Sequence, residues 1–167
     1  SKVISFFKKH YLIFLLFIVL ISYGQILGMN AWKDDNAIFF KFDHINEDTG
    51  FFGKGVFGVG PYKFSIAPYY PIYKVFGNES MVPYYILILF FYLISTLCVY
   101  YLFGKIISPT AGKIASFLFA SGFIASGGFY WLANAMLAHL AILSLSLILF
   151  FYYRYYKVRK LYNYLFA

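Results

Sequence analysis

The sequence is short of charged residues. Only 12% of its 167 residues are Asp, Glu, Lys or Arg, whereas soluble domains average roughly 25%. Apolar residues make up 62% of the chain, and six acidic residues stand against fourteen basic ones. This composition excludes an ordinary soluble domain and indicates a protein embedded in a lipid bilayer. The net charge of +8 is explained by membrane topology and attraction to anionic lipid, so we expect no nucleic-acid partner.

The sequence also has only one cysteine, Cys98. A single cysteine excludes a disulfide within this stretch and a cysteine metal cluster. What the sequence has in abundance is long runs without charge. At about 1.5 Å of rise per helical residue, such a run needs about 20 residues to cross a hydrocarbon core of roughly 30 Å.

These runs predict an all-α membrane protein with about four transmembrane helices. The run over 114–153 has no acidic or basic side chain except His139 and is about twice as long as one crossing requires, so we expect it to fold back near "SGGFYWLANA", residues 126–135. His139 is then a functional candidate inside a span, although a neutral histidine bonded to a neighbouring helix is the more common case. The predicted spans are about 10–29, 82–104, 113–130 and 135–153, with a long loop of interfacial helices over 30–81.

A cleaved signal peptide is the alternative interpretation of the first run, because Lys2, Lys8 and Lys9 precede it. The run is longer than the apolar part of most signal peptides, and "GQILGMNAW" is a poor cleavage site. We therefore expect an anchor.

The charges predict an orientation. All six acidic residues lie between the first and second predicted spans, and nine of the fourteen basic residues lie on the opposite side of the membrane. The positive-inside rule then places the N-terminus in the cytoplasm and the loop 30–81 on the extracytoplasmic side.

The loop 30–81 contains the adjacent carboxylates Asp34 and Asp35, which follow the first span and so lie near the lipid head groups. Adjacent residues of a helix point about 100° apart, so one carboxylate would face a site and the other would support it. The simpler interpretation of "KDDN" is a helix start, with acids in the first turn favoured by the helix dipole.

Four stretches follow one another along the chain: "WKDDNAIFF", "PYYPIYKVFGNESMVPYY", "CVYYLFGKIISPTAGKIASFLFA" and "FYWLANAMLAHLAILSLSLILFFYYRYYKVRK". Their order resembles the N-terminal part of GT-C glycosyltransferases, especially the branch of the protein O-mannosyltransferases and the transmembrane tetratricopeptide mannosyltransferases. Two features depart from that pattern. Tyr70 stands where the family has an arginine before the loop proline, and the turn after the third span carries no second acid.

The resemblance implies a sugar transfer from a polyprenyl-phosphate-linked donor to an unidentified acceptor outside the cytoplasm, and a chain that is the N-terminal part of a longer protein. Asp34 or Asp35 would be the catalytic base, or would bind a divalent cation if one is used. A non-catalytic membrane subunit or a lipid-carrier transporter is the alternative. The residues expected to contact substrate are Trp32, Lys63, Tyr69, Tyr70 and Lys74.

Overall fold

The structure, a computed structural model, describes residues 10–30, 33–43, 65–122 and 132–158. All secondary structure within these ranges is helical. The elements are α2 (Tyr11–Tyr23), the 3-10 turn η1 (Gly24–Gly28), α3 (Lys33–Asp43), the 3-10 turn η2 (Ala67–Tyr69), α5 (Tyr70–Phe76), α6 (Val82–Ile106), α7 (Pro109–Ser121) and α9 (Leu132–Val158).

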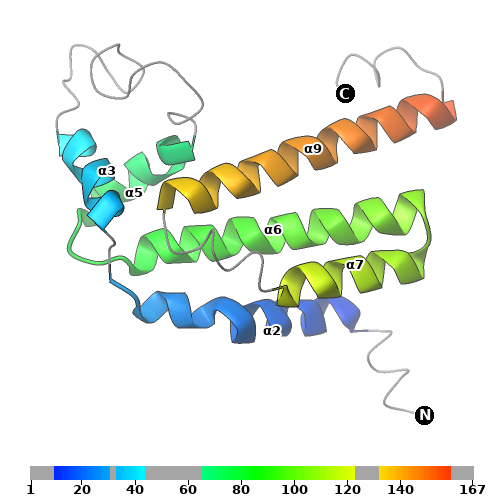
Figure 1. The fold of residues 1–167 in the computed structure, drawn as a ribbon, viewed down its shortest axis with the longest axis horizontal. Helices are drawn as coiled ribbons and strands as arrows, with labels where there is room; N and C mark the ends of the chain where they lie inside the picture. The colour runs from blue at the N-terminus through cyan, green and yellow to red at the C-terminus, as the bar shows by residue number, and fades with distance from the viewer. Residues whose placement is uncertain (1–9, 31–32, 44–64, 123–131, 159–167) are drawn as a thin grey trace.

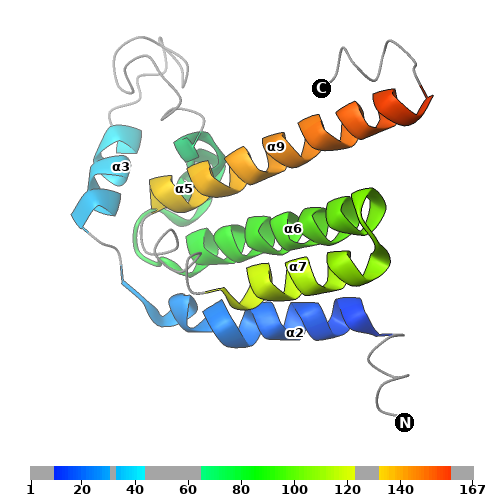
Figure 2. The same ribbon diagram turned by 45° about the vertical axis from the view of Figure 1, so that its right-hand side comes forward.

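The long helices form a bundle around α6 (Figure 1). On one side α6 packs against α7, which runs back antiparallel to it, and on the other it packs against α9; α2 lies against α7 (Figures 1 and 2). The turn between α6 and α7 lies at one end of the bundle, together with the C-terminal end of α9. At the other end, α3 and α5 lie beside the starts of α6 and α9.

Within the described residues, three segments are long and apolar enough to cross a membrane: Tyr11–Gly28, Val82–Ile106 and Asn134–Lys157. They coincide with the first, second and fourth spans predicted from the sequence, and they support an integral membrane protein. The predicted span 113–130 has no such match, because α7 ends at Ser121 after 13 residues and 123–131 lie outside the described residues. About 20 Å of helix is shorter than a hydrocarbon core, so the count of four spans stays a prediction.

The two ends of the bundle differ in charge. The basic end, as we call it, carries Lys105, Lys113, Arg154 and Lys157 and none of the acidic residues that the structure describes. The loop end carries α3 with its three aspartates, Glu79 just before α6, and the lysines of α3 and α5. The separation of acids from the basic end agrees with the charge pattern that predicted the orientation, and the assignment of the basic end to the cytoplasm stays a prediction.

The α6–α7 hairpin is held together by a close approach of two glycines. A Cβ atom added to Gly112 would lie 2.8 Å from the Cα of Gly104 and 2.5 Å from the carbonyl oxygen of Tyr100. Small residues let helix backbones approach closely in membranes, where packing replaces the hydrophobic effect as the driving force for association. Glycine at position 112 is therefore what allows α7 to lie directly on α6.

Buried tyrosines at the start of α6 connect the membrane helices to the loop end. The Tyr84 hydroxyl donates a hydrogen bond to the carbonyl of Gly77 at 2.6 Å, and the Tyr85 hydroxyl donates one to the carbonyl of Asn30 at 3.4 Å. Gly77 follows the last residue of α5 and has a φ angle of +60°, a backbone conformation that residues with a side chain rarely adopt. These contacts fix the position of α5 and of the end of the first span relative to α6.

Candidate functional site

Asp35 lies on the buried face of α3. Ile38, Phe39 and Phe42 follow it at the i+3, i+4 and i+7 positions, which share one face of a helix, and all four side chains are buried. Phe39 packs on Tyr84 with ring centroids 5.2 Å apart. The apolar face of α3 thus seats the helix at the loop end of the bundle and carries the Asp35 carboxylate inward with it.

The buried Asp35 carboxylate contacts the first residue of a membrane helix. Its Oδ1 accepts a hydrogen bond of 2.9 Å from the backbone N–H of Leu132, where α9 begins. The first N–H groups of a helix have no partner within the helix, and the helix dipole favours a negative charge beside them. Asp35 therefore acts as a capping group for α9, although it lies on α3.

Tyr69, the last residue of η2, contacts the same residue of α9. Its hydroxyl donates a hydrogen bond of 2.7 Å to the carbonyl of Leu132, and its side chain has no exposed surface. Burial, and then the nearby Asp35 charge, raise the pKa of the Tyr69 hydroxyl well above its ordinary value. Tyr69 thus stays protonated and serves as a hydrogen-bond donor; in this conformation it offers no ring face to a sugar.

Two other residues predicted to contact substrate lie together on α5. The Nζ of Lys74 lies 5.5 Å from the centre of the Tyr70 ring, close enough for a cation–π contact, and Lys74 is exposed. Tyr70 also packs against Phe42 of α3, with ring centroids 5.5 Å apart. The structure therefore brings an exposed cation and a half-buried aromatic ring to the surface beside α3.

A hydrogen bond from the Tyr73 hydroxyl to the Asp43 carboxylate also joins α5 to α3. This bond raises the pKa of the Tyr73 hydroxyl to about 12. The ring of Tyr73 packs on Phe39 and Phe42, with centroids 5.9 and 5.2 Å apart. The two short helices are thus connected at both their apolar faces and their polar edges.

The remaining predicted site residues are only partly placed. Asp34 lies in the first turn of α3, next to Asp35, as the interpretation of "KDDN" as a helix start expected. Trp32 and Lys63 lie outside the described residues. Within the described part of the chain, no three His, Cys, Asp or Glu side chains come together as metal ligands, so we derive no step through a metal ion.

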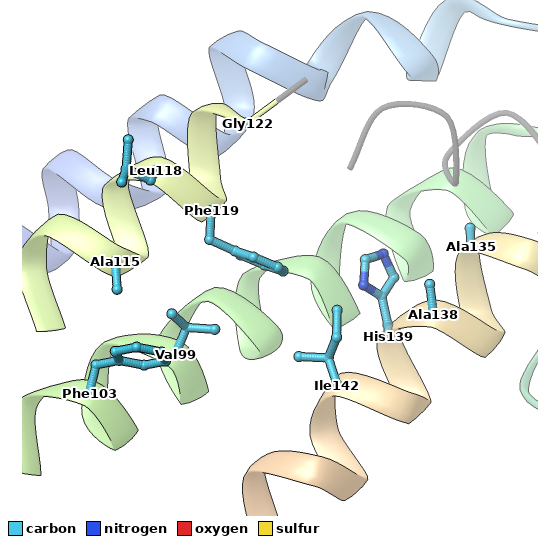
Figure 3. Close-up of a pocket in the computed structure, with 10 residues that line it drawn as sticks. All are labelled: Val99, Phe103, Ala115, Leu118, Phe119, Gly122, Ala135, Ala138, His139 and Ile142. Atoms are coloured by element: carbon cyan, nitrogen blue, oxygen red, sulfur yellow. The ribbon is translucent and has the colours of Figure 1, made fainter. Parts of the chain in front are cut away.

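A cavity of about 610 Å³ lies away from these residues, between α6, α7 and α9 (Figure 3). Its walls are apolar except for His139, and neither Asp35 nor Tyr69 lines it. Phe119 and Ile142 point into it from opposite sides in Figure 3. The lining residues are Val99 and Phe103 of α6, Ala115, Leu118, Phe119 and Gly122 of α7 or its end, and Ala135, Ala138, His139 and Ile142 of α9.

The inner end of this cavity is formed where α7 stops within the bundle. The Tyr92 hydroxyl donates to the carbonyl of Phe119 at 2.5 Å, and the Tyr23 hydroxyl donates to the carbonyl of Gly122 at 2.6 Å. Both carbonyls belong to the end of α7, and the last carbonyls of a helix lack their regular helical donors. The carbonyl of Phe119 also accepts a bond of 3.4 Å from the N–H of Gly122. The ring of His139, which is 4% exposed, lies against Tyr92 with centroids 5.4 Å apart. Tyrosines from α2 and α6 thus donate hydrogen bonds to the carbonyls at the end of α7.

No family model, curated protein or solved structure matches this chain. The resemblance to GT-C glycosyltransferases is therefore carried by the four sequence stretches alone. The function has to be argued from the residues and from the geometry just described.

The contact between Asp35 and α9 was not predicted from the sequence. A signal for its direction was present, because Asp35, Ile38, Phe39 and Phe42 have the spacing of one helical face. That spacing indicates that Asp35 points inward with the apolar residues. The hydrogen-bond partner of Asp35 is the backbone N–H of Leu132, 97 positions later in the chain, and no sequence pattern indicates that pairing.

Proposed function

We propose that this protein is an integral membrane glycosyltransferase of the GT-C type, which transfers a sugar from a polyprenyl-phosphate-linked donor to a hydroxyl of an acceptor at the loop end of the bundle. Asp34 is the catalytic base and Asp35 is the positioning residue beside it. One observation supports this assignment of roles to the two aspartates: the Asp35 carboxylate is buried and hydrogen-bonded to the start of α9. Helical geometry gives adjacent carboxylates different directions, which leaves Asp34 for the chemistry.

Asp35 contributes by holding α3 on the membrane helices. Its hydrogen bond to Leu132, together with the bond from Tyr69 to the same residue, fixes the first turn of α3 at the level of the first turn of α9. That level is where the sugar of a membrane-anchored donor would reside, because the phosphate of such a donor lies among the lipid head groups. A base held in place by a neighbouring contact needs no reorganisation when the acceptor arrives.

The reaction forms a bond between the acceptor oxygen and the anomeric carbon of the sugar and breaks the bond from that carbon to the donor phosphate. The Asp34 carboxylate takes the acceptor proton as the new bond forms, a contribution of about 10²–10⁴ in rate for general bases. The electron pair of the broken bond stays on the phosphate oxygen. Lys74, exposed on α5 beside Tyr70, supplies positive charge for that leaving group.

The test is a transfer assay on membranes that contain the full-length protein, with polyprenyl-phosphate sugars as donors. We expect Asp34→Asn to lower the rate by about 10²-fold or more at unchanged protein level, since an amide accepts no proton. Asp35→Asn keeps a hydrogen-bond acceptor for Leu132 and should lower the rate less. Glu79→Gln, an exposed acid at the same end, is the matched control and should have no effect. Unchanged transfer by both aspartate variants would contradict the proposal.

The cavity between α6, α7 and α9 favours a second candidate, a lipid-carrier transporter. Transporters place binding sites near the middle of the membrane, where a helix is interrupted and polar groups meet. Here α7 ends beside Tyr92, which lies within α6, and His139 lines the adjoining cavity. Movement of a fluorescent polyprenyl phosphate across vesicles, lost in His139→Leu and retained in Asp34→Asn, would support the transporter instead.

A further inference from the structure

Both ends of α5 are fixed where two membrane helices begin. Tyr69, which directly precedes α5, donates its hydroxyl hydrogen bond to the carbonyl of Leu132, the first residue of α9. Gly77, which directly follows α5, accepts at its carbonyl the hydrogen bond from the hydroxyl of Tyr84, in the first turn of α6. The short helix is therefore held at the level of both helix starts, and it lies beside them in Figures 1 and 2.

That level is the boundary between the hydrocarbon core of the membrane and the lipid head groups. The segments of α6 and α9 that can cross a membrane begin there, at Val82 and Asn134. The segment that begins at Val82 has 25 residues, a length of about 37 Å, so it exceeds a core of roughly 30 Å and its first turn lies near the head groups. A helix held at this boundary can bury an apolar side roughly 5–10 Å deep, between head groups and acyl chains.

The two sides of α5 differ in what covers them. On one side the half-buried ring of Tyr70 packs on Phe42 of α3, with ring centroids 5.5 Å apart. On the other side Val75 and Phe76 are 73% and 54% exposed, and Pro71, one helical turn before Val75, is exposed as well. The aromatic side of α5 therefore faces the protein, and the outer side presents apolar side chains at the level of the lipid boundary.

The one charged residue of α5 lies at the edge of this outer side. At about 100° per residue, Lys74 comes between Tyr70 and Pro71 around the helix. Its Nζ lies 5.5 Å from the centre of the Tyr70 ring, and the side chain is exposed. Lysine at such a position lays its aliphatic stem along apolar surface while the ammonium reaches the head groups. An apolar side bordered by a lysine is typical of helices that lie in a membrane interface.

The exposed side of α3 is different in character. Phe40 is 63% exposed, but Asn36 and Asp43, which share its side of the helix at i−4 and i+3, are exposed too. An amide and a carboxylate lose free energy when they leave water for acyl chains. The exposed side of α3 therefore suits water, whereas the exposed side of α5 suits lipid.

We propose that α5 is an interfacial anchor: Pro71, Val75 and Phe76 insert into the lipid leaflet at the loop end, while Phe40 of α3 stays in water. The lipid thereby sets the depth of α5 in the membrane, and the contacts between α5 and α3 hold α3 at the same depth. The anchor does not rest on the proposed glycosyl transfer, because it follows from the position and the exposed residues of α5.

Spin labelling of the full-length protein in phosphatidylcholine vesicles tests the depth of α5. In a Cys98→Ser background, nitroxides are attached at Val75→Cys and Phe76→Cys, with Phe40→Cys as the reference for water and Ile86→Cys, 54% exposed on α6, as the reference for lipid. Collisions with oxygen report lipid, and collisions with a water-soluble nickel chelate report water. We expect the ratio of oxygen to nickel collisions at Val75→Cys and Phe76→Cys to be about tenfold higher than at Phe40→Cys. A ratio equal to that of Phe40→Cys would overturn the proposal, and so would protection from both reagents, which would mean that protein covers α5.

Removal of the two exposed side chains tests the anchor itself. The reporter is a nitroxide at Pro71→Cys, on the same side of α5. Val75→Ser with Phe76→Ser should raise nickel collisions at that position about tenfold, because the two apolar side chains no longer favour the lipid. Phe40→Ser removes a similarly exposed ring from α3 and should leave the collisions unchanged. Unchanged collisions in the double variant would refute the anchor; if that variant does not fold, the depths of the four labelled positions decide.

Discussion

The carboxylate of Asp35 on α3 accepts a hydrogen bond from the backbone N–H of Leu132, the first residue of α9, at 2.9 Å. The contact joins a short helix of the loop end to a membrane helix 97 positions later in the chain. A buried carboxylate is costly unless it is hydrogen-bonded, and the start of a helix supplies both a free donor and a favourable dipole. The N–H of Leu132 thus compensates the burial of the Asp35 carboxylate, and the carboxylate supplies the acceptor that the start of α9 lacks.

Removing the Asp35 carboxylate should destabilise the protein. Asp35→Ala leaves the buried N–H of Leu132 without this acceptor, which costs about 1–3 kcal/mol, so we expect the free energy of unfolding to fall by about 2 kcal/mol. Asp35→Asn keeps an oxygen acceptor but loses the charge, and should cost about half as much. Reversible unfolding in mixed micelles measures both. Equal losses for the two variants would mean that the charge, and not the hydrogen bond, stabilises α9.

Tyr69→Phe should cost less than Asp35→Ala, although both residues contact Leu132. In Tyr69→Phe, the carbonyl of Leu132 loses the bond from the tyrosine hydroxyl but keeps the bond from its helical donor four residues later. We therefore expect the free energy of unfolding to fall by about 1 kcal/mol. Because Tyr69 and Asp35 hold the same residue, the double variant should lose less than the sum of the single losses. Strict additivity in that cycle would show that the two contacts act independently.

Gly112→Ala should loosen the α6–α7 hairpin. The new Cβ would meet the backbone of Gly104 and Tyr100 at 2.8 and 2.5 Å, and backbone atoms cannot move aside as a flexible side chain can. Overpacking of this kind costs about 1–3 kcal/mol. Gly24→Ala is the matched control, because no atom lies within 4 Å of its added Cβ and its backbone is helical. A thermal unfolding temperature that falls equally in both variants would contradict the close packing at Gly112.

The contact between Tyr73 and Asp43 should depend on pH in the alkaline range. The pKa of the Tyr73 hydroxyl is raised from 10.0 to about 12, so the stabilisation from this bond is fully present below about pH 10 and is lost as the pH rises through about 12. Asp43→Asn removes the negative charge and should return the pKa of Tyr73 toward 10.0. The ultraviolet absorbance of tyrosinate, compared with that of Tyr73→Phe, reports this one phenol. An unchanged titration in Asp43→Asn would contradict the contact.

The membrane character and three of the spans could be predicted because they depend on local composition. A run of about 20 uncharged apolar residues favours helix and bilayer wherever it occurs, so 10–29, 82–104 and 135–153 match the segments of the structure that can cross a membrane. The stretch 113–130 is also largely apolar, although it contains more glycine and serine than the other runs, and α7 ends at Ser121. Its end is favoured by hydroxyls of Tyr23 and Tyr92, which come from two other helices. Hydropathy along the chain holds no information about such partners.

In the candidate site, too, local features could be predicted from the sequence and contacts between distant segments could not. The sequence by itself determined that Asp34 and Asp35 stand at the start of a short helix after the first span, since charge and helix geometry are local properties. Only the tertiary structure decided that Asp35 caps α9 while Tyr70 and Lys74 stay at the surface, because a backbone N–H of Leu132 becomes a partner only when two distant segments are folded together. The physical reason is that a hydrogen bond depends on position in space, whereas apolarity is a property that each segment carries with it.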